Sequence, residues 1–455
     1  MTKPRRESSY ESAIFATTTD RRKQVESWVG DTFSKARKGA FLIVVGQGQT
    51  AGDFMQLPNK VARALLVFEH SPVEMDKVDS WRIWAMERGA WEVHVAFLPF
   101  YEGADEARYK EIVRQCKGWN APPAMLETVK IKKGDYVQMS PDSSDRNLAT
   151  LLTMTLGTAM GELLTRVETL ARRFKEKGVK PASKAAADYL KEIAKLLENK
   201  ETTESPPELK DVKPSPDRIP KLLLRGDSGV GKSLIAGYLH SRSGGEGRHL
   251  RISIPEYLEK EDMFEYDFFG YAKGAYTGGK EEGSAGLLLS HVGQVVFLDE
   301  IGEANEYLQA KLLAFLDDYR VRPRGWEGKP FYCPVAIVAA TNKNLTKMAE
   351  EGTFRGDLLA RFTDRHVIPG LNDRIGDLPF ILDCLLQREA MNPNLEIERV
   401  GEGAYDALKN RDYTTGNFRQ LENLFRSACE LALRDDRKDL VRADVEQAAT
   451  ADQNF

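Results

Sequence analysis

The chain has 455 residues, enough for two or three domains, and its 42% hydrophobic and 29% charged residues are typical of a globular protein. A formal net charge of −4 gives no general basic character, so nucleic-acid binding would need a local basic patch. The cysteines form no Cys-x-x-Cys pair, which favours reduced thiols over a zinc or disulfide framework. We expect no secretory signal and no membrane span, and therefore a cytoplasmic protein.

Residues 1–145 form the first predicted domain, in which apolar runs alternate with helical patterns. The strands are expected at 12–16, 41–45, 64–68 and 91–97, and the helices at 20–38 and 76–88. This alternation predicts an α/β, Rossmann-like fold with a parallel or mostly parallel sheet. We expect a sensory or regulatory role for this domain.

Polar loops follow the first two predicted strands. They contain Thr17, Thr18, Thr19 and Asp20 in the first loop and residues 46–50 in the second. Open α/β sheets bind ligands at the carboxyl ends of their strands, so these loops are candidates for holding a small-molecule or nucleotide effector. The alternative is that they are turns and helix caps, because Gly, Thr and Asp are common there.

Residues 146–218 form the predicted connector. Helical patterns cover 147–177 and 183–197, and a charged, proline-rich linker follows from 198 to 220. The two helices either pack against a domain, transmit a conformational change, or form a dimerisation seam. The sequence leaves these three alternatives open.

A phosphate-binding loop lies between the apolar run at 222–224 and a helical pattern beginning at Leu234. It has the spacing Gly-x-x-x-x-Gly-Lys-Ser and consists of Gly226, Asp227, Ser228, Gly229, Val230, Gly231, Lys232 and Ser233. The glycines allow backbone N–H groups to surround phosphate oxygens. Lys232 is expected to neutralise the β- and γ-phosphates, and Ser233 to offer its hydroxyl to Mg²⁺. The sequence therefore predicts ATP and Mg²⁺ as ligands.

Two further apolar strands are expected to end beside this loop. The run at 295–298 leads into Asp299 and Glu300, which suit a Mg²⁺ ligand and the base that orients the attacking water. The run at 335–340 leads to Asn342, a polar side chain suited to sensing the γ-phosphate. The three strands together predict an ATPase core.

Three arginines follow. Arg355 and Arg361 lie six residues apart on a predicted helix, from which they can reach a neighbouring subunit and stabilise the charge that develops during phosphoryl transfer. Arg419 opens a helix in a predicted all-helical lid. The alternative for the first two is ordinary surface charge.

The order of these motifs resembles the AAA+ domain of bacterial enhancer-binding proteins, the activators of sigma-54 RNA polymerase. The similarity covers about residues 220–433 and includes the segments 268–279 and 297–303. It implies a large α/β ATPase subdomain at 219–371 and a helical lid at 372–455. It also implies a ring, typically a hexamer, in which each active site is completed by the next subunit.

By this resemblance, the predicted residues take the family's roles. Lys232 and Ser233 bind nucleotide and Mg²⁺, the carboxylates form Walker B, and Asn342 belongs to sensor I. Arg355 and Arg361 match the arginines that act in trans, and Arg419 matches sensor II. The family's loop that touches sigma-54 corresponds to Gly274, Ala275, Tyr276, Thr277, Gly278 and Gly279.

Three departures from the family pattern stand out. Tyr276 replaces a phenylalanine and Gly279 an alanine in the partner loop, defined as residues 274–279. The stretch 251–256 lacks the asparagine that restrains the catalytic glutamate in the family. We expect no DNA-binding module after Leu433.

Three hypotheses remain. The first is a sigma-54-dependent activator gated by the first domain. The second is a motor of the same lineage that remodels another protein, for example in stress or phage defence. The third is a nucleotide-switched sensor or scaffold, which the intact Walker B pair disfavours.

Overall fold

The computed structural model describes most of the chain. The described residues are 13–16, 18–36, 40–50, 63–70, 73–90, 92–97, 106–107, 109–110, 131–138, 158–177, 184–199, 207–209, 216–245, 249–275 and 280–452. Contacts group them into two compact units. The first unit lies within 1–166, 228–230 and 369–455, and the second within 167–227 and 231–368.

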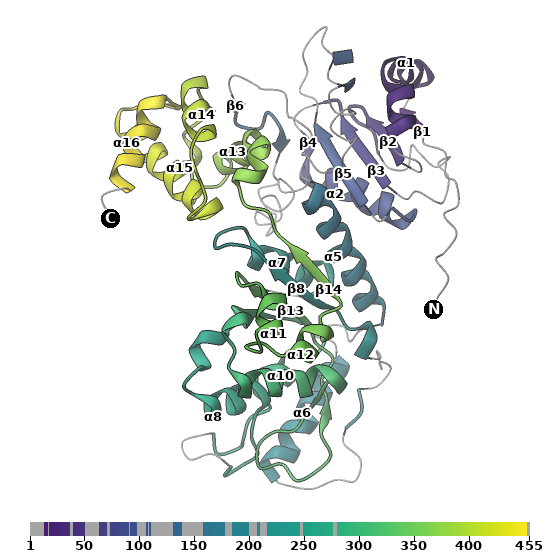
Figure 1. Ribbon diagram of the computed structural model, residues 1–455, viewed down its shortest axis with the longest axis vertical. Helices are drawn as coiled ribbons and strands as arrows, with labels where there is room; N and C mark the ends of the chain where they lie inside the picture. The colour runs from purple at the N-terminus through teal and green to yellow at the C-terminus, as the bar shows by residue number, and fades with distance from the viewer. Residues whose placement is uncertain are drawn as a thin grey trace. The chain divides into compact units, whose positions relative to one another are not determined.

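A four-stranded parallel sheet forms the centre of the first predicted domain (Figure 1). Its strands, in spatial order, are β1 (Ala13–Ala16), β2 (Ala40–Val45), β3 (Arg63–Phe68) and β5 (Glu92–Phe97). Among its described residues, this domain contains the helices α1 (Thr19–Ala36) and α2 (Met75–Glu87) and a short helical stretch within 106–110. The parallel sheet and the alternation of strand and helix confirm the α/β prediction.

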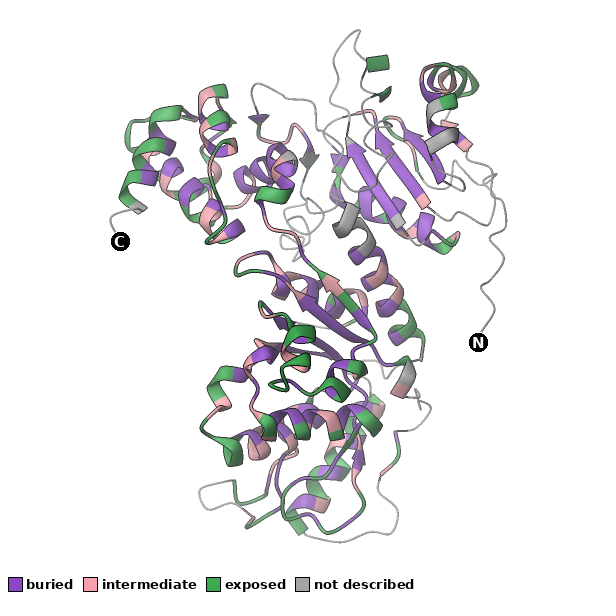
Figure 2. Ribbon diagram, in the orientation of Figure 1, coloured by how far each residue is buried: buried purple, intermediate pink, exposed green. Residues whose placement is uncertain are grey.

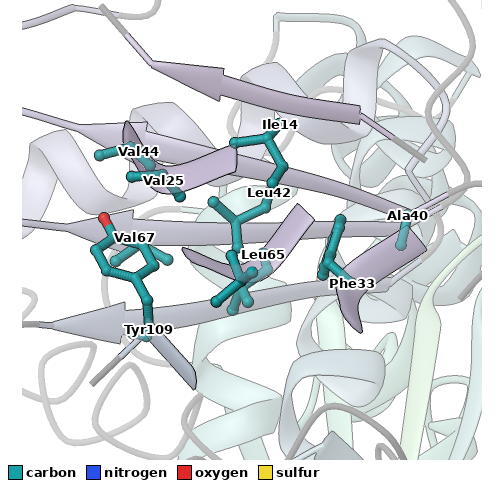
Figure 3. Close-up of a cluster of buried hydrophobic side chains, with 11 residues drawn as sticks. Ile14, Val25, Phe33, Ala40, Leu42, Val44, Leu65, Val67 and Tyr109 are labelled. Carbon is teal, nitrogen blue, oxygen red and sulfur yellow. The ribbon is translucent and has the colours of Figure 1, made fainter. Parts of the chain in front are cut away.

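Apolar side chains join α1 to one face of this sheet. Val25, Val29 and Phe33 lie on one side of the helix and are buried in the same cluster as Leu42 and Val44 of β2 (Figure 3). Leu42 and Val44 are two residues apart, so they point to the same face of the strand. The helical period of α1 and the alternation along β2 therefore produce the same core.

The second unit contains a five-stranded parallel sheet. Its strands, in spatial order, are β14 (Asp364–Val367), β8 (Lys221–Arg225), β13 (Ala336–Thr341), β10 (Val295–Asp299) and β9 (Leu250–Ser253). The central strands β13, β8 and β10 are almost entirely buried, as Figure 2 shows. Strands buried on both faces explain the continuous apolar runs of the sequence.

Helices and a short hairpin complete the second unit. The helices are α7 (Lys232–Arg242), α8 (Glu261–Phe264), α9 (Gly286–Ser290), α10 (Glu306–Asp318), α11 (Leu345–Glu350) and α12 (Gly356–Arg361). The hairpin pairs β11 (Arg320–Val321) with β12 (Phe331–Tyr332). These elements belong to the same compact unit as the five-stranded sheet.

The lid belongs to the first unit and is mainly helical. Its helices are α13 (Leu378–Leu386), α14 (Glu402–Lys409), α15 (Asn417–Arg434) and α16 (Arg442–Asp452). It also contains the two-residue strands β15 (Arg399–Val400) and β16 (Asp439–Leu440). The strand β6 (Ile131–Lys132) adds to them to make a sheet of order β16-β15-β6. A further pair joins β4 (Val73–Glu74) to β7 (Val137–Gln138).

Two helices form the connector. α5 (Thr158–Lys177) and α6 (Lys184–Asn199) agree with the predicted helical patterns, and the predicted residues 147–157 lie outside the described part of the chain. Glu168 of α5 is buried and accepts hydrogen bonds from the Tyr238 hydroxyl and, at 2.8 Å, from Arg242 Nε of α7. Within the second unit, the connector therefore packs against α7 of the predicted ATPase core, which is one of the three alternatives left open.

Among the described residues, every helix is too short or too polar to cross a membrane.

Candidate nucleotide-binding site

The loop between β8 and α7 has the backbone of a phosphate cradle. Gly229 and Gly231 have φ angles of 79° and 99°, a left-handed region that favours glycine. Lys232 is buried at 8% exposure, and its Nζ donates to the carbonyl oxygens of Gly226 at 2.8 Å and Asp227 at 3.1 Å. Ser233 lies in the first turn of α7 and is partly exposed. The sequence therefore folds here as its motif predicts.

The P-loop is joined to the end of β13. Gly226 N–H donates to the Thr341 carbonyl at 3.1 Å, and Thr341 is the last residue of that strand. Thr341 Oγ1 accepts the Lys343 N–H at 3.0 Å, which fixes the turn that contains Asn342. Asn342 itself is exposed. The structure thus places the predicted sensor at the carboxyl end of the strand next to β8.

The two predicted Walker B carboxylates lie at the carboxyl end of β10. Arg251 Nη2 of β9 contacts Asp299 Oδ2 at 2.6 Å, and the Glu300 N–H donates to Asp299 Oδ1 at 3.1 Å. Glu300 has a left-handed φ of 54°, and its Oε2 is buried without a hydrogen-bond partner. A buried carboxylate oxygen without a donor is costly and is suited to accept a hydrogen bond from water or substrate.

The contact with Asp299 gives Arg251 a role that the motif did not indicate. Arg251 lies in the stretch where the family asparagine is missing, and its guanidinium occupies one Walker B oxygen. Only the pairing of β9 with β10 brings these residues together. No local sequence signal could have identified this contact.

Arg355 is exposed, Arg361 is partly exposed, and both are paired within the chain. Arg355 Nη2 lies 2.8 Å from Asp357 Oδ2, and Arg361 forms an ion pair with Asp317. The backbone of Arg355 is fixed by the side chain of Gln309, whose Oε1 accepts the Arg355 N–H at 2.7 Å. Gln309 is 1% exposed and escaped the sequence analysis. The only signal for Gln309 in the sequence was a polar amide side chain among the apolar residues of α10.

The amino end of α15 contacts the tip of the P-loop within the first unit. Asn417 Nδ2 donates to the Ser228 carbonyl at 3.0 Å, and its Oδ1 accepts the Leu371 N–H at 2.9 Å. Phe418 N–H donates to the Gly229 carbonyl at 3.2 Å. Arg419, the predicted sensor II, is exposed next to these residues. A Cβ at Gly229 would lie 2.3 Å from the Gly416 carbonyl oxygen, so this approach requires glycine.

Asn417 was not singled out from the sequence. It is 2% exposed and has a φ of 49°, a conformation that asparagine tolerates better than most residues. The Gly-Asn pair before a helix was its only local signal. Its two side-chain hydrogen bonds connect the P-loop tip to the segment that precedes the lid helices.

A buried ion pair supports the same helix end. Arg374 Nε donates to Asp377 Oδ2 at 3.1 Å, and the guanidinium lies 5.1 Å from the centre of the Phe418 ring. Burial raises the pKa of the Asp377 carboxyl to about 6, although Arg374 lies beside it. These contacts pack the start of α15 against the beginning of the lid.

The base of the partner loop is held from two sides. Tyr271 N–H donates to the Ser284 carbonyl at 2.8 Å, and Ala272 N–H donates to the Arg324 carbonyl at 2.8 Å. Lys273 N–H donates to the Leu197 carbonyl of α6 at 3.0 Å. Gly274 and Ala275 are described, whereas Tyr276, Thr277, Gly278 and Gly279 lie outside the described residues.

The candidate effector loops of the first domain make the contacts of turns and caps. Thr18 Oγ1 accepts the Arg21 N–H at 3.2 Å at the start of α1. Gln49 Oε1 accepts the Gly46 N–H at 2.7 Å. These contacts support the alternative interpretation, and an effector site there stays a prediction.

Comparison with known proteins supports the resemblance. Residues 198–367 match the family described as "Sigma-54 interaction domain". The protein of the HyuA 5′ region of Pseudomonas sp. (strain NS671) is 40% identical over 171 residues, which are 36% of this chain and 56% of that protein. The Nif-specific regulatory protein of Azorhizobium caulinodans is 36% identical over 215 residues, or 46% of this chain and 34% of that protein. The resemblance inferred from the motifs is therefore confirmed for this part of the chain.

A further sequence match and one solved structure are also similar to this chain. The nitric oxide reductase transcription regulator NorR1 of Cupriavidus necator is 34% identical over 231 residues, or 50% of this chain and 44% of that protein. A crystal structure of NtrX from Brucella abortus in complex with ADP aligns with a TM-score of 0.45 at 18% identity, over 96% of this chain and 84% of that one. The matches span 34% to 56% of the length of the three relatives compared by sequence.

Proposed function

We propose that this chain is an ATP-hydrolysing AAA+ motor that remodels sigma-54 RNA polymerase through its partner loop, under the control of its first domain. The observation that carries the proposal is Glu300, whose unpartnered buried oxygen lies beside Asp299 at the end of β10 in a segment that matches the sigma-54 interaction family. The proposal includes the division of the chain into a first domain (1–145), a connector (146–218), a large ATPase subdomain (219–371) and a lid (372–455).

The residues fit ATP and Mg²⁺. Lys232 would contact the β- and γ-phosphates, and the backbone between Gly226 and Gly231 would surround them. Ser233 and Asp299 would hold Mg²⁺, which neutralises charge on the phosphates when it is bound. The Asp299 carboxylate would be shared by Mg²⁺ and Arg251, whose guanidinium contacts Oδ2 of that carboxylate.

Glu300 would act as the general base. Its free oxygen would accept a proton from the attacking water as the bond from that water to the γ-phosphorus forms and the bond to the β–γ bridging oxygen breaks. Asn342 would report whether the γ-phosphate is present. The exposed position of Asn342 at the end of β13 is consistent with this role.

A neighbouring subunit would complete each site. Arg355 is exposed and Arg361 partly exposed, and each is paired with an acid of its own chain, Asp357 and Asp317. Exposed ion pairs contribute little free energy, so each arginine can exchange its partner for a phosphate at small cost. We therefore propose a ring, typically a hexamer, with arginines acting in trans and Arg419 acting as sensor II in cis.

The second candidate is a motor of the same lineage that acts on another protein. It is favoured by Gly279, which replaces the family alanine in the partner loop. Glycine gives that position more backbone freedom than alanine would.

A binding experiment separates the two candidates. The purified protein is incubated with sigma-54 and ADP–aluminium fluoride, which mimics the transition state, and sigma-54 is recovered by pull-down. The first candidate predicts retention that depends on the analogue and is lost in Thr277→Ala, while Glu281→Gln, just beyond the loop, retains it. Failure of the wild-type protein to retain sigma-54, with ATP turnover intact, would support the second candidate.

A further inference from the structure

A segment near the end of the first predicted domain, beyond its four-stranded sheet, is built into the lid. β6 pairs antiparallel with β15, so that Ile131 lies opposite Val400 and Lys132 opposite Arg399. The Lys133 N–H donates to the Glu398 carbonyl at 2.9 Å. Ile131 is fully buried. We refer to residues 131–138 as the clasp.

A buried carboxylate of the lid accepts hydrogen bonds from the clasp. Asp383 of α13 is 0% exposed, and its two oxygens accept the N–H groups of Gly134 at 2.6 Å and Tyr136 at 3.2 Å. The Tyr136 ring lies 5.2 Å from the ring of Phe380 on the same helix. Since a buried carboxylate that loses hydrogen-bond donors is costly, loss of the clasp would destabilise α13 by removing the Gly134 and Tyr136 N–H donors from Asp383.

The other side of the clasp is joined to β4, which lies just before α2 of the first domain. The Val73 N–H donates to the Tyr136 carbonyl at 3.1 Å, and β4 pairs in parallel with β7. β4 leads directly into α2, so a movement of that helix would act on Tyr136 through two residues of backbone. Tyr136 thus donates its N–H to the lid and offers its carbonyl to the first domain.

The lid carries the connection to the P-loop. Arg388, just after α13, donates from Nη1 to Glu422 Oε1 of α15 at 2.6 Å. The amino end of α15 in turn contacts Ser228 and Gly229 through Asn417 and Phe418. All of these contacts lie inside the first unit.

We propose that the clasp couples the state of the first domain to the affinity of the P-loop for nucleotide. A docked clasp holds α13 and α15 in place and keeps the lid against the loop tip. A released clasp exposes Asp383, loosens α15 and weakens nucleotide binding. This regulation rests on the proposed function, since it requires that the P-loop binds ATP. The signal from the first domain would reach the P-loop through the lid instead of through the connector helix α5.

Gly134 offers a matched pair of variants. Its φ is 81° and no atom lies within 4 Å of a Cβ built there, so a side chain meets strain and no clash. Gly134→Val strains the turn because a β-branched residue is disfavoured at positive φ, whereas Gly134→Asn tolerates it. Both variants leave the lid and the P-loop unchanged in sequence.

The test uses the full chain. The dissociation constant for a fluorescent ATP analogue is measured by titration, and hydrogen exchange of residues 131–138 reports release of the clasp. We expect Gly134→Val to increase exchange and to weaken binding by about tenfold, a typical coupling between two sites. Gly134→Asn should match the wild-type protein in both measurements. Tyr136→Ala, which removes the ring packed on Phe380, should repeat the weakening.

The outcomes separate this proposal from the proposed function. Faster exchange of the clasp with unchanged nucleotide affinity in both Gly134→Val and Tyr136→Ala would overturn the coupling. That result would leave the proposed function standing, since the wild-type protein would still bind and hydrolyse ATP. A wild-type protein that binds no nucleotide would instead overturn the proposed function.

Discussion

Glu300 is the residue on which turnover depends in this account. Glu300→Gln preserves the size of the side chain and removes the base, so we expect kcat to fall by at least about a hundredfold while nucleotide binding is retained. Steady-state ATPase assays and a nucleotide titration measure the two effects. Glu303→Gln is the matched control, because Glu303 forms only a partly exposed ion pair with Lys343 and should keep near wild-type turnover. Equal turnover in Glu300→Gln and wild type would refute the assigned base.

At the residue scale, protonation of His249 makes the free energy of unfolding depend on pH. Burial, with contributions from His240 and Arg251, lowers its pKa from 6.5 to about 4 in the folded protein. The unfolded chain therefore binds this proton more readily, so the stabilisation is present above pH 6.5 and is lost as the pH falls toward 4. Between pH 6.5 and pH 4, the free energy of unfolding measured with denaturant should fall less in His249→Gln than in the wild-type protein. Measurements at pH 8, where the imidazole is neutral in both states, are the control, and identical pH profiles would contradict this.

At the scale of elements, the contact between α15 and the P-loop tip is the least expected. Asn417→Ala and Asn417→Gly both remove the hydrogen bonds to Ser228 and Leu371, and only glycine relieves the left-handed φ. We expect both variants to bind nucleotide up to about thirtyfold more weakly, because the two lost hydrogen bonds contribute about 1 kcal/mol each. The alanine variant should also unfold at lower denaturant concentration than the glycine variant. Wild-type affinity in both would show that the lid contact does not support binding.

The longer elements could be predicted because their signals are local. β2, β3, β10 and β13 come from apolar runs, and their observed ends lie within one residue of the predicted ones. The two-residue strands β4, β6, β7, β15 and β16 had no such signal. Their pairing joins residues as distant as Lys132 and Arg399, so it depends on the folded arrangement instead of on sequence pattern.

At the scale of the whole molecule, the same distinction applies to the candidate site. Lys232, Asp299 and Glu300 were predicted because each belongs to a motif within a few residues of a strand end. Arg251 and Asn417 were missed because they reach the site from another strand and from the lid. The chemistry of the site was therefore visible in the sequence, while the contacts that position it were not.

In the proposed mechanism, ATP is hydrolysed between adjoining subunits. Mixing two inactive proteins tests it: Glu300→Gln, which keeps its arginines, and the double variant Arg355→Ala/Arg361→Ala, which keeps its base. Each should be nearly inactive alone. In randomly mixed rings at equal amounts, about a quarter of the interfaces combine an intact base with intact arginines, so the mixture should regain about a quarter of wild-type turnover. A mixture no more active than its two components, in rings shown to contain both, would contradict the account.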